Sequence, residues 1–298
     1  MGFDRLALIE LISDDDRLAI SGIPQAEAEG VKLAVEPDGI FSTAFKTVTR
    51  SGAFQVGGDA VGDDIPIREL TLPFNLYDNG DGIEATVHRF RMMWRQGRSI
   101  TWRYKSARSG ARWLRVRLSQ EIKFSPETDW NLNGYAKAVV TAIAVQPMYQ
   151  SAEDVQTATF AGSGSGIEYL EFWNPTDQRC YLEWDLDPGK YAFPDFSFGL
   201  ESEYDRNTGQ DADRVITTPT LTQRLSVMAD PQYDTYVSAD LSNASGLFNG
   251  VEPLYWLPPY TPRTSVPVFA WSGTAGRQVM CTMRRFWSAE SGLEAGFI

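Results

Sequence analysis

The stretch YLEFWNPTDQRCYLEWDLDPG, residues 169–189, is the most informative part of this sequence. Two runs in which apolar and polar residues alternate flank the tetrapeptide Asn174-Pro175-Thr176-Asp177. Alternation with a period of two is typical of a strand with one packed face, and Asn, Pro and Asp favour turns. The stretch therefore predicts a β-hairpin that buries one face, with a further turn at Pro188-Gly189.

The rest of the chain repeats this pattern of short runs and turns. β-Branched or aromatic runs alternate with turn pairs that end in glycine: Asp38-Gly39, Gly57-Gly58, Asn79-Gly80, Ser109-Gly110, Asn133-Gly134 and Asn249-Gly250. Such spacing predicts a mainly β chain. One segment differs, because Ile83, Val87, Phe90 and Trp94 recur with helical spacing. We expect a single helix near residues 83–96, capped by Asp81 and ended by Gly97.

Charge is distributed unevenly along the 298 residues. The chain has a net charge of -12 and 43% hydrophobic residues, enough for a sizeable core and unfavourable for general binding to nucleic acid or anionic membranes. Residues 1–88 sum to -10, residues 89–117 to +10 without a single acid, and residues 118–298 to -12. The basic segment also contains aromatic residues, a composition that suits single-stranded nucleic acid. Their alternation favours a packed sheet face beside a solvated or partner-facing basic patch.

The strand pattern pauses after Gln146-Pro147, where the small, polar stretch QSAEDVQTATFAGSGSG begins. It predicts a boundary between domains 1–150 and 151–298, or a hairpin loop just inside the second domain. Cys180 and Cys281 are the only cysteines and are expected to be small buried hydrophobes. The amino-terminal run is broken by Glu10, which predicts neither a signal peptide nor a membrane span and favours folding in a reducing cytoplasm.

No motif in the sequence predicts catalysis, a cofactor or a metal. The glycines at 162, 164 and 166 lack the following helix that a phosphate-binding loop requires, so a flexible loop is expected. The run from Asp78 to Glu84 resembles half a calcium loop, but its register places Tyr77 at the first ligand position. His88 is the only histidine and is expected at the surface or in an interface.

Acidic and aromatic residues gather between positions 171 and 201. Two acids beside aromatic platforms could form a glycosidase site or a noncatalytic carbohydrate-binding surface, although any acidic β-sandwich scatters carboxylates over its outer faces. The candidates are Glu171, Glu183, Asp185, Asp187, Asp195 and Glu201, near Trp173, Trp184, Tyr191 and Phe196.

Several segments resemble the minor tail proteins of long-tailed phages that infect actinobacteria, and the length and two-part layout look like the distal tail protein of that group. The resemblance covers mainly residues 65–190 and 250–294. Its motifs are Asn-Pro-Thr-Asp after an aromatic strand, Trp-x-Leu-x-Pro-Gly, and Pro-Pro-Tyr-Thr-Pro before an Arg-Arg-x-Trp-Ser ending. It implies an amino-terminal belt domain (a β-sandwich or split barrel with one helix) that closes into a hexameric ring, and a carboxy-terminal galectin-like β-sandwich.

The expected role is therefore a non-enzymatic component of a virion tail tip that joins the tail tube to the adhesion apparatus. Expected partners are copies of itself, the tail tube protein, a tail-associated hub protein and other minor tail proteins, with no cofactor, no membrane and no stable nucleic-acid binding. The alternatives are a minor tail protein whose sandwich binds host-surface glycans and, third, an enzyme that cuts cell-wall polysaccharide.

Two residue sets follow from the charge distribution. Subunits in a ring meet through two different surfaces, which can carry opposite charge without self-repulsion. The arginines expected to face acids of a neighbouring subunit are Arg91, Arg95, Arg98, Arg103 and Arg108. If DNA passes through the ring, acids should line the channel, because phosphate contacts would hold the duplex. The lumen candidates are Asp14, Asp15, Asp16, Asp63 and Asp64.

Overall fold

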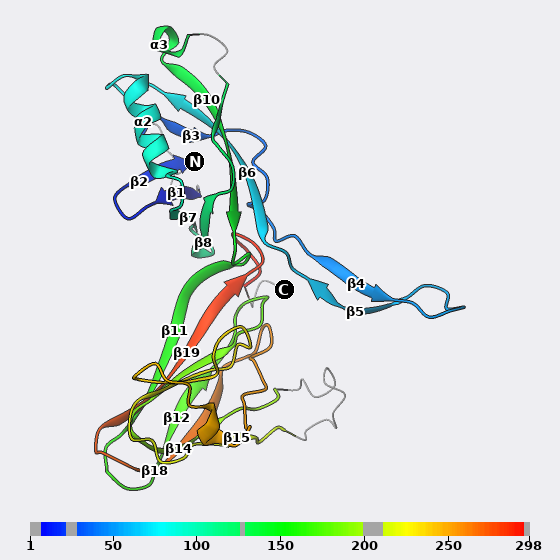
Figure 1. The fold of residues 1–298 in the computed structure, drawn as a ribbon, viewed down its shortest axis with the longest axis vertical. Helices are drawn as coiled ribbons and strands as arrows, with labels where there is room; N and C mark the ends of the chain where they lie inside the picture. Colours follow the sequence, from blue (N-terminus) through cyan, green and yellow to red (C-terminus); the bar gives the residue numbers. More distant parts are fainter. Residues whose placement is uncertain (1–6, 22–28, 126–128, 199–210, 295–298) are drawn as a thin grey trace. The chain divides into compact units, whose positions relative to one another are not determined.

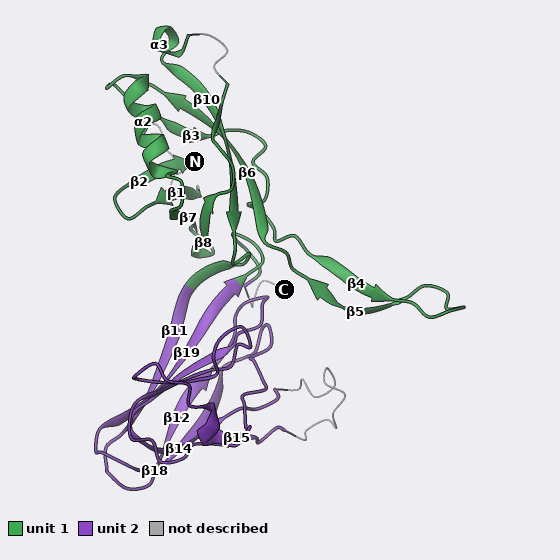
Figure 2. Cartoon of the chain, viewed as in Figure 1, with its two compact units in different colours: residues 1–151, 287–293 green, residues 152–286, 294–298 purple. Residues whose placement is uncertain are grey.

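The computed structural model describes residues 7–21, 29–125, 129–198 and 211–294 (Figure 1). The chain divides into two compact units (Figure 2): residues 1–151 with 287–293, and residues 152–286 with 294–298. Antiparallel strands dominate both units, which confirms the prediction of a mainly β chain. Whether residues 1–150 and 151–298 fold as independent domains stays a prediction.

The first unit is built on an antiparallel sheet with strand order β2-β1-β7-β8-β10-β6-β3, and β9 also pairs with β10. The strands of this sheet are β1 (Leu8–Ile12), β2 (Arg17–Ser21), β3 (Val31–Leu33), β6 (Arg68–Tyr77), β7 (Ser99–Ser106), β8 (Gly110–Leu118), β9 (Lys123–Phe124) and β10 (Tyr135–Ala144). Strands β6 and β10 pair along their full length, from Arg68↔Ala144 to Tyr77↔Tyr135. Every second residue of both strands is buried, so the sheet has one inner and one outer face.

Helix α2 (Ile83–Met93) packs on the inner face, as its helical spacing predicts. The ring centres of Phe90 and Phe74 of β6 lie 5.0 Å apart in an edge-to-face contact. Both predicted ends are wrong: Gly82, not Asp81, is the N-cap residue and no side chain caps the helix, which ends at Met93 with Trp94 as its C-cap and not at Gly97. The Asp78 carboxylate instead accepts hydrogen bonds from the backbone N–H groups of Gly80 (2.8 Å) and Gly82 (2.9 Å), which fixes the preceding turn. The short helix α3 (Trp130–Asn133) also forms, with Asp129 as its cap.

A separate two-stranded ribbon, β4 (Lys46–Arg50) with β5 (Asp59–Asp64), belongs to the same unit. Every residue of both strands is exposed. The turn pair Gly57-Gly58 lies between the two strands, but the sequence did not predict a ribbon without a buried face. The ribbon therefore contributes nothing to the core of the unit.

The segment 287–293 returns to the first unit and is held there by two buried arginines. The Arg112 guanidinium donates to the carbonyl oxygens of Ala289 (2.8 Å) and Gly292 (2.6 Å). Arg68 donates to the carbonyl oxygen of Ser288 (3.0 Å) and lies over the ring of Tyr149. Burial lowers the pKa of Arg68. Backbone carbonyls thus accept hydrogen bonds from both buried guanidinium groups.

The second unit is a sandwich of two antiparallel sheets, with strand orders β17-β16-β13-β19-β11 and β12-β18-β14-β15. Its strands are β11 (Tyr149–Phe160), β12 (Gly166–Phe172), β13 (Leu182–Leu186), β14 (Gly189–Pro194), β15 (Val215–Thr217), β16 (Leu225–Met228), β17 (Tyr236–Ser238), β18 (Thr264–Gly273) and β19 (Arg277–Trp287), with a 3-10 turn at Ser245–Phe248. Aromatic rings of the two sheets meet in the core. The ring centre of Trp184 of β13 lies 5.6 Å from that of Phe172 of β12 and 4.9 Å from that of Phe193 of β14.

The hairpin predicted for residues 169–189 is wrong, although both of its strands exist. Strand β12 pairs with β18, whereas β13 pairs with β16 and β19 in the other sheet. The connection is buried rather than exposed, because the Asn174 amide donates to the carbonyl oxygens of Gln178 (2.8 Å), Leu257 (3.2 Å) and Pro258 (2.9 Å). Asn174 thus satisfies the buried backbone of a crossover between the sheets, a role that local sequence does not distinguish from a turn.

Candidate functional site

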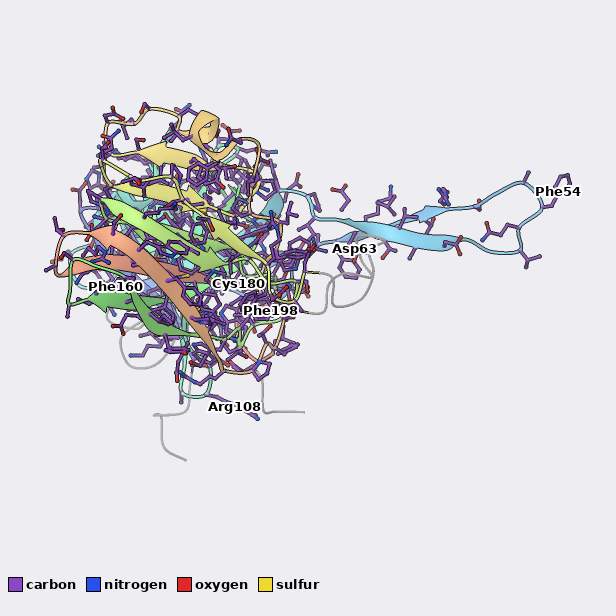
Figure 3. All side chains as sticks on the ribbon, turned by 90° about the horizontal axis from the view of Figure 1, so that it is seen from below. Phe54, Asp63, Arg108, Phe160, Cys180 and Phe198 are labelled. Atoms are coloured by element: carbon purple, nitrogen blue, oxygen red, sulfur yellow. The ribbon has the colours of Figure 1, made fainter. Side chains whose placement is uncertain are left out.

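The ribbon β4–β5 is the most exposed part of the first unit. Figure 3 shows Phe54 at its tip and Asp63 nearer its base. The side chains of Phe54 and Val56 are fully exposed, and Val48 and Val61 of the strands are also exposed. Phe54 has a φ of 69°, in the left-handed region that non-glycine residues rarely adopt. Exposed apolar side chains on a two-stranded ribbon point to a surface that a partner covers.

Two of the predicted lumen residues, Asp63 and Asp64, lie on this ribbon. Asp64 pairs in register with Lys46, and Asp63 with Thr47. A third acid, Asp59, pairs in register with Arg50 at the far end of β5. The ribbon therefore combines apolar side chains with acids that are exposed to solvent.

The other predicted lumen residues, Asp14, Asp15 and Asp16, form the turn between β1 and β2. Arg89 of α2 binds both carboxylate oxygens of Asp16, at 2.7 and 2.8 Å. Hydrogen bonding from Arg89 lowers the pKa of Asp16. Asp14 forms an ion pair with Arg98 at 3.3 Å. The turn and the carboxyl end of α2 thus enclose a shallow hollow, lined by both charge types and by Met92 and Met93.

The arginines predicted for a subunit interface have different surroundings. Arg98 already pairs with Asp14, and Arg103 forms an ion pair with the buried carboxylate of Glu10, which also binds Arg17. Arg91 is exposed and lies over the ring of Phe124, 4.7 Å from its centre. Arg95 lines the hollow, and Arg108 lies exposed in the β7–β8 turn (Figure 3).

Sequence reasoning passed over two further cations, Arg115 and Arg117 of β8. Both point to the outer face of the sheet, because their neighbours Leu114 and Val116 point into the core. Register places Arg115 opposite Thr101 and Arg117 opposite Ser99. Within the described part of the chain, Arg95, Arg115 and Arg117 have no carboxylate partner. The alternation in RWLRVRL was the signal that could have identified this outward pair.

In the second unit, the described candidate carboxylates have polar partners. Glu171 pairs with Arg263, Glu183 with Arg284, and Asp185 with Arg224. Asp187 accepts from the backbone N–H of Gln278 (2.8 Å). The buried Asp195 pairs with Arg214 and accepts from the backbone N–H groups of Leu254 and Tyr255. Glu201 lies outside the described residues. These contacts give the described acids polar partners within the unit.

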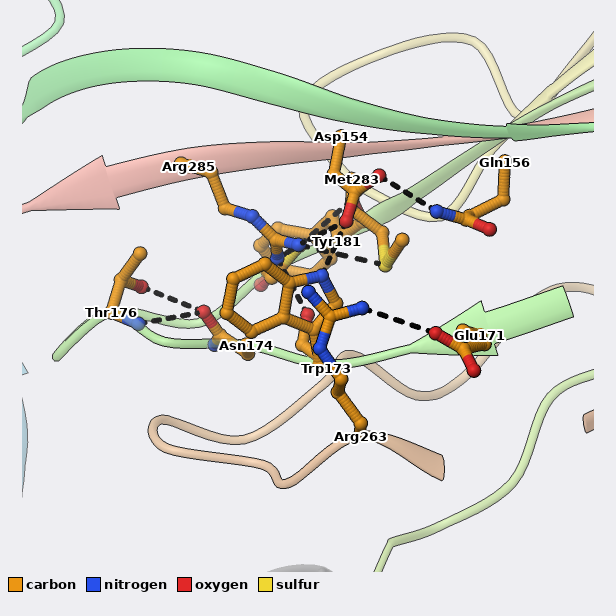
Figure 4. A network of polar contacts seen from close by, with 11 residues as sticks. Asp154, Gln156, Glu171, Trp173, Asn174, Thr176, Tyr181, Arg263, Met283 and Arg285 are labelled. Atoms are coloured by element: carbon orange, nitrogen blue, oxygen red, sulfur yellow. Dashed lines mark hydrogen bonds and ion pairs between the residues drawn. The ribbon is translucent and has the colours of Figure 1, made fainter. Parts of the chain in front are cut away.

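Trp173 lies at the centre of a polar network (Figure 4). The guanidinium groups of Arg263 and Arg285 lie 4.3 and 4.9 Å from its ring centre. Its indole N–H donates to Asp154, which also accepts from Gln156 and Arg285. Burial opposes ionisation of Asp154, but these hydrogen bonds and the charge of Arg285 outweigh it and lower the pKa. The network is consistent with a structural anchor for the end of β12.

The remaining sequence motifs have simple structural surroundings. His88 is exposed on α2, as predicted. The carbonyl oxygens of Gly162 and Gly164 accept hydrogen bonds from Arg277, so this loop is anchored to β19. Cys180 and Cys281 are buried free thiols, as predicted, and burial raises the pKa of Cys180 to about 11.

The described residues contain no candidate metal site and no helix that could span a membrane. No group of three or more His, Cys, Asp or Glu side chains could hold a metal ion in residues 7–21, 29–125, 129–198 and 211–294. No helix within those ranges is long and apolar enough to cross a membrane.

Comparison with known proteins finds similarity in structure alone. No protein-family model matches the sequence, and no curated protein matches it. The fold is similar to that of Dit from phage SPP1, described as a paradigm of the hub adsorption apparatus in phages that infect Gram-positive bacteria. The two chains are 10% identical, the match covers 92% of this chain and 98% of that chain, and the TM-score is 0.57.

Two structures of the phage P2 baseplate in its activated conformation are also similar. The structure with Ca is 10% identical with a TM-score of 0.46, and the structure with Sr is 12% identical with a TM-score of 0.42. Each match covers 94% of this chain and 98% of the other.

Proposed function

We propose that this chain is a structural component of a phage tail tip, a ring-forming distal tail protein that connects the tail tube to the adhesion apparatus. The observation that carries the proposal is the fold shared with SPP1 Dit, which extends over nearly the whole length of both chains. A fold shared over both units constrains function more than one shared domain does, although function itself depends on surfaces.

The proposal includes a hexameric ring in the virion, with the tail tube protein, a hub protein and other minor tail proteins as partners. It includes no enzymatic step, no cofactor and no stable binding of nucleic acid. The actinobacterial host is a prediction from the sequence motifs.

The ribbon β4–β5 supports a role in assembly. An isolated two-stranded ribbon is at best marginally stable in water. This ribbon has no buried face and exposes Phe54, Val56 and Val61. Covering it with a neighbouring copy would remove these side chains from water, with a gain of roughly 25 cal/mol per Å² of apolar surface. The copy-to-copy contact therefore supplies the support that the ribbon lacks within its own unit.

The ribbon and the outer face of the sheet carry opposite charges, so the ribbon of one copy can bind the sheet face of the next. The ribbon carries Asp59, Asp63 and Asp64, and the outer sheet face carries Arg115 and Arg117 without carboxylate partners in the described residues. Acids on one surface and arginines on another suit the head-to-tail contact of a ring. Arg91, Arg95 and Arg108 extend the basic surface in this proposal. Arg98 and Arg103 would have to share their intrachain acids with the neighbour.

The acids of the β1–β2 turn are assigned to the channel. Asp14 and Asp15 are exposed, so they can repel phosphate even though Asp14 also pairs with Arg98. Asp63 and Asp64 can serve either the channel or the contact between copies. Reversing the charges of Asp14 and Asp15 in one variant, and of Asp63 and Asp64 in another, separates the two roles.

The experiment that tests the proposed function is protein mass spectrometry of purified phage particles from cells that carry the chain in its natural gene neighbourhood. The proposal predicts this chain in the particles, at a constant ratio to the tail tube protein. Particles that infect normally without the chain contradict it.

The alternative from the sequence, glycan binding by the sandwich, is favoured by one observation. The aromatic side chains of Tyr169 and Trp271 are exposed on the second unit. Purified cell-wall polysaccharide should then bind the full chain. This binding should be lost in the variants Tyr169→Ala and Trp271→Ala.

A further inference from the structure

Residues 44–67 form an uninterrupted exposed segment of the first unit. Every residue in this range is exposed, including all of β4 and β5 and the turn that joins them. The side chains at either end of the segment, Thr43 and Arg68, are buried. Within the described residues, no hydrogen bond or ion pair joins residues 44–67 to another part of the chain. The polar contacts that attach the ribbon to its unit therefore lie at these two ends.

The two ends of the segment are clamped together. The Arg68 guanidinium donates to the Thr43 hydroxyl and, at 3.0 Å, to the carbonyl oxygen of Ser288. The backbone N–H (2.9 Å) and the hydroxyl (2.8 Å) of Thr43 donate to the same carbonyl. Residues 44–45 and 65–67, which connect this clamp to the ribbon, belong to neither strand. A fixed base with unpaired connections allows β4 and β5 to separate while the core of the unit stays folded.

The pairing of β4 with β5 has little to stabilise it. The register shifts between Val48 and Thr49, so an irregularity interrupts the ladder. Gly62 lies within β5, and further glycines at 52, 57 and 58 lie in the connection. Glycine loses more conformational freedom on folding than any other residue, and each exposed hydrogen bond returns little against water. A two-stranded ribbon with no packed face is at best marginally stable.

Strand β6 begins at Arg68, directly after this segment, and differs from the ribbon in both respects. It pairs with β10 along its full length, and its residues Leu70, Leu72, Phe74 and Leu76 are buried in the core. Opening β6 would disrupt the whole unit, whereas opening the ribbon exposes no buried side chain. Neighbouring segments of one unit therefore differ in local stability, and β6 serves as an internal reference for the ribbon.

A second copy supplies the cover that the ribbon lacks in its own unit, because Asp59, Asp63 and Asp64 of the ribbon complement Arg115 and Arg117 of β8. We infer that β4 and β5 are separated for most of the time in the free chain and pair when a second copy covers them. The first half of this inference concerns one copy alone, and the second half rests on the proposed function. Ordering on assembly weakens self-association by the fraction of time for which the strands are paired in the free chain.

Hydrogen exchange of the full chain tests the first half, at concentrations where light scattering finds single copies. The backbone amides of residues 46–50 and 59–64 should exchange within about tenfold of the rates of unstructured peptides. The amides of β6 should exchange at least about a thousandfold more slowly, since they open only with the unit. Protection of the ribbon equal to that of β6 in the free chain overturns the inference.

A disulfide across the ribbon provides a second test. Thr49 and Ala60 lie directly opposite each other, and both are exposed and uncharged. Directly paired residues of antiparallel strands have Cα separations that suit a disulfide. The native cysteines, Cys180 and Cys281, are buried. The variant is therefore Thr49→Cys with Ala60→Cys, and its reduced form is the matched control for its oxidised form.

The oxidised and reduced forms should melt at the same temperature as single copies. A cross-link stabilises a fold by restricting the unfolded chain, and it gains nothing where the linked segment is also open in the folded state. A higher melting temperature after oxidation would show that the ribbon is paired in the free chain, and would overturn the inference.

Oxidation should tighten self-association, by about tenfold if the strands of the free chain are paired about a tenth of the time. The ribbon amides of the unmodified chain should also become protected in the oligomer. An oligomer whose ribbon exchanges as fast as in the free chain, or whose affinity is unchanged by oxidation, overturns the inference. A chain that never self-associates contradicts the proposed ring and the second half together, whereas the exchange rates and melting temperatures of single copies decide the first half by themselves.

Discussion

The guanidinium carbon of Arg112 lies 3.7 Å from the ring centre of Trp287. Arg112 comes from a strand of the first unit, and Trp287 is the last residue of β19. The stacking contact and the hydrogen bonds from Arg112 to Ala289 and Gly292 keep the returning segment in the first unit. Hydrogen bonds from a buried cation to backbone carbonyls therefore attach the returning segment to strand β8.

Replacing Arg112 with methionine should destabilise the first unit by about 3 kcal/mol, because charge-assisted hydrogen bonds are lost and buried carbonyls lose their donors. Urea unfolding followed by tryptophan fluorescence measures the change. The control is Arg115→Met, an exposed position three residues along the same strand, which should change stability by at most about 0.5 kcal/mol. Equal effects of the two substitutions would contradict the role given to Arg112.

The second unit should fold alone. Its core includes Phe172, Trp184 and Phe193 from both sheets, and all of these residues lie between 152 and 286. A fragment of residues 152–286 is expected to unfold cooperatively on heating, monitored by near-ultraviolet circular dichroism. A fragment of residues 151–298 should also fold but expose the Trp287 side chain. Gradual loss of signal in both fragments would show that the sandwich requires the first unit.

The ribbon should matter for assembly and not for the stability of one copy. Replacing Phe54 and Val56 with serine is expected to change unfolding free energy by less than about 0.5 kcal/mol, since both side chains are fully exposed. The same change should reduce oligomer formation, measured by light scattering over a range of protein concentrations. An unaltered oligomer would mean that the ribbon serves another partner or none.

Charge reversal should separate the two classes of arginine in the basic segment. Arg115→Glu with Arg117→Glu removes cations that have no carboxylate partner in the described residues, and should hinder ring closure while the copy stays folded. Arg95→Glu with Arg98→Glu should also hinder closure, with some loss of monomer stability because Arg98 pairs with Asp14. Rim pairs are typically worth about 0–1 kcal/mol each, so the native oligomer should weaken, not vanish, as salt rises. A salt-independent oligomer that tolerates both double variants would contradict this interface.

Both cysteines should resist thiol reagents while the chain is folded. Burial raises the pKa of Cys180 to about 11 and that of Cys281 well above its ordinary value, so almost no thiolate forms near neutral pH. Above about pH 8.5 the unfolded thiols ionise whereas the folded ones stay protonated, and stability should fall as the pH rises through that region. Colorimetric thiol titration in buffer and in denaturant measures accessibility. Rapid reaction without denaturant would indicate that the second unit opens.

The sequence predicted what depends on local periodicity. The spacing of Ile83, Val87 and Phe90 identified helix α2, and alternation identified most strands. The pairing between strands was not predictable in the same way. The local sequence around Asn174 is compatible both with a hairpin turn and with a buried crossover between two sheets. Alternation does place Arg112 on the same side as Leu114 and Val116, but only the structure shows the carbonyls that make a buried arginine acceptable there.

The candidate surfaces were predictable in part. Charge counting along the sequence identified a basic segment, but it could not show that Arg98 and Arg103 would meet Asp14 and Glu10 of the same chain. The ribbon was missed because neither of its strands has a buried face that would give an apolar alternation.

The most direct measurement of the central claim is electron microscopy of phage particles labelled with antibodies against the full chain. If the chain is a distal tail protein, the label lies at the end of the tail that is farthest from the capsid, in particles that also adsorb to host cells. Label on the capsid, or unlabelled particles from cells that make the chain in quantity, would contradict the account.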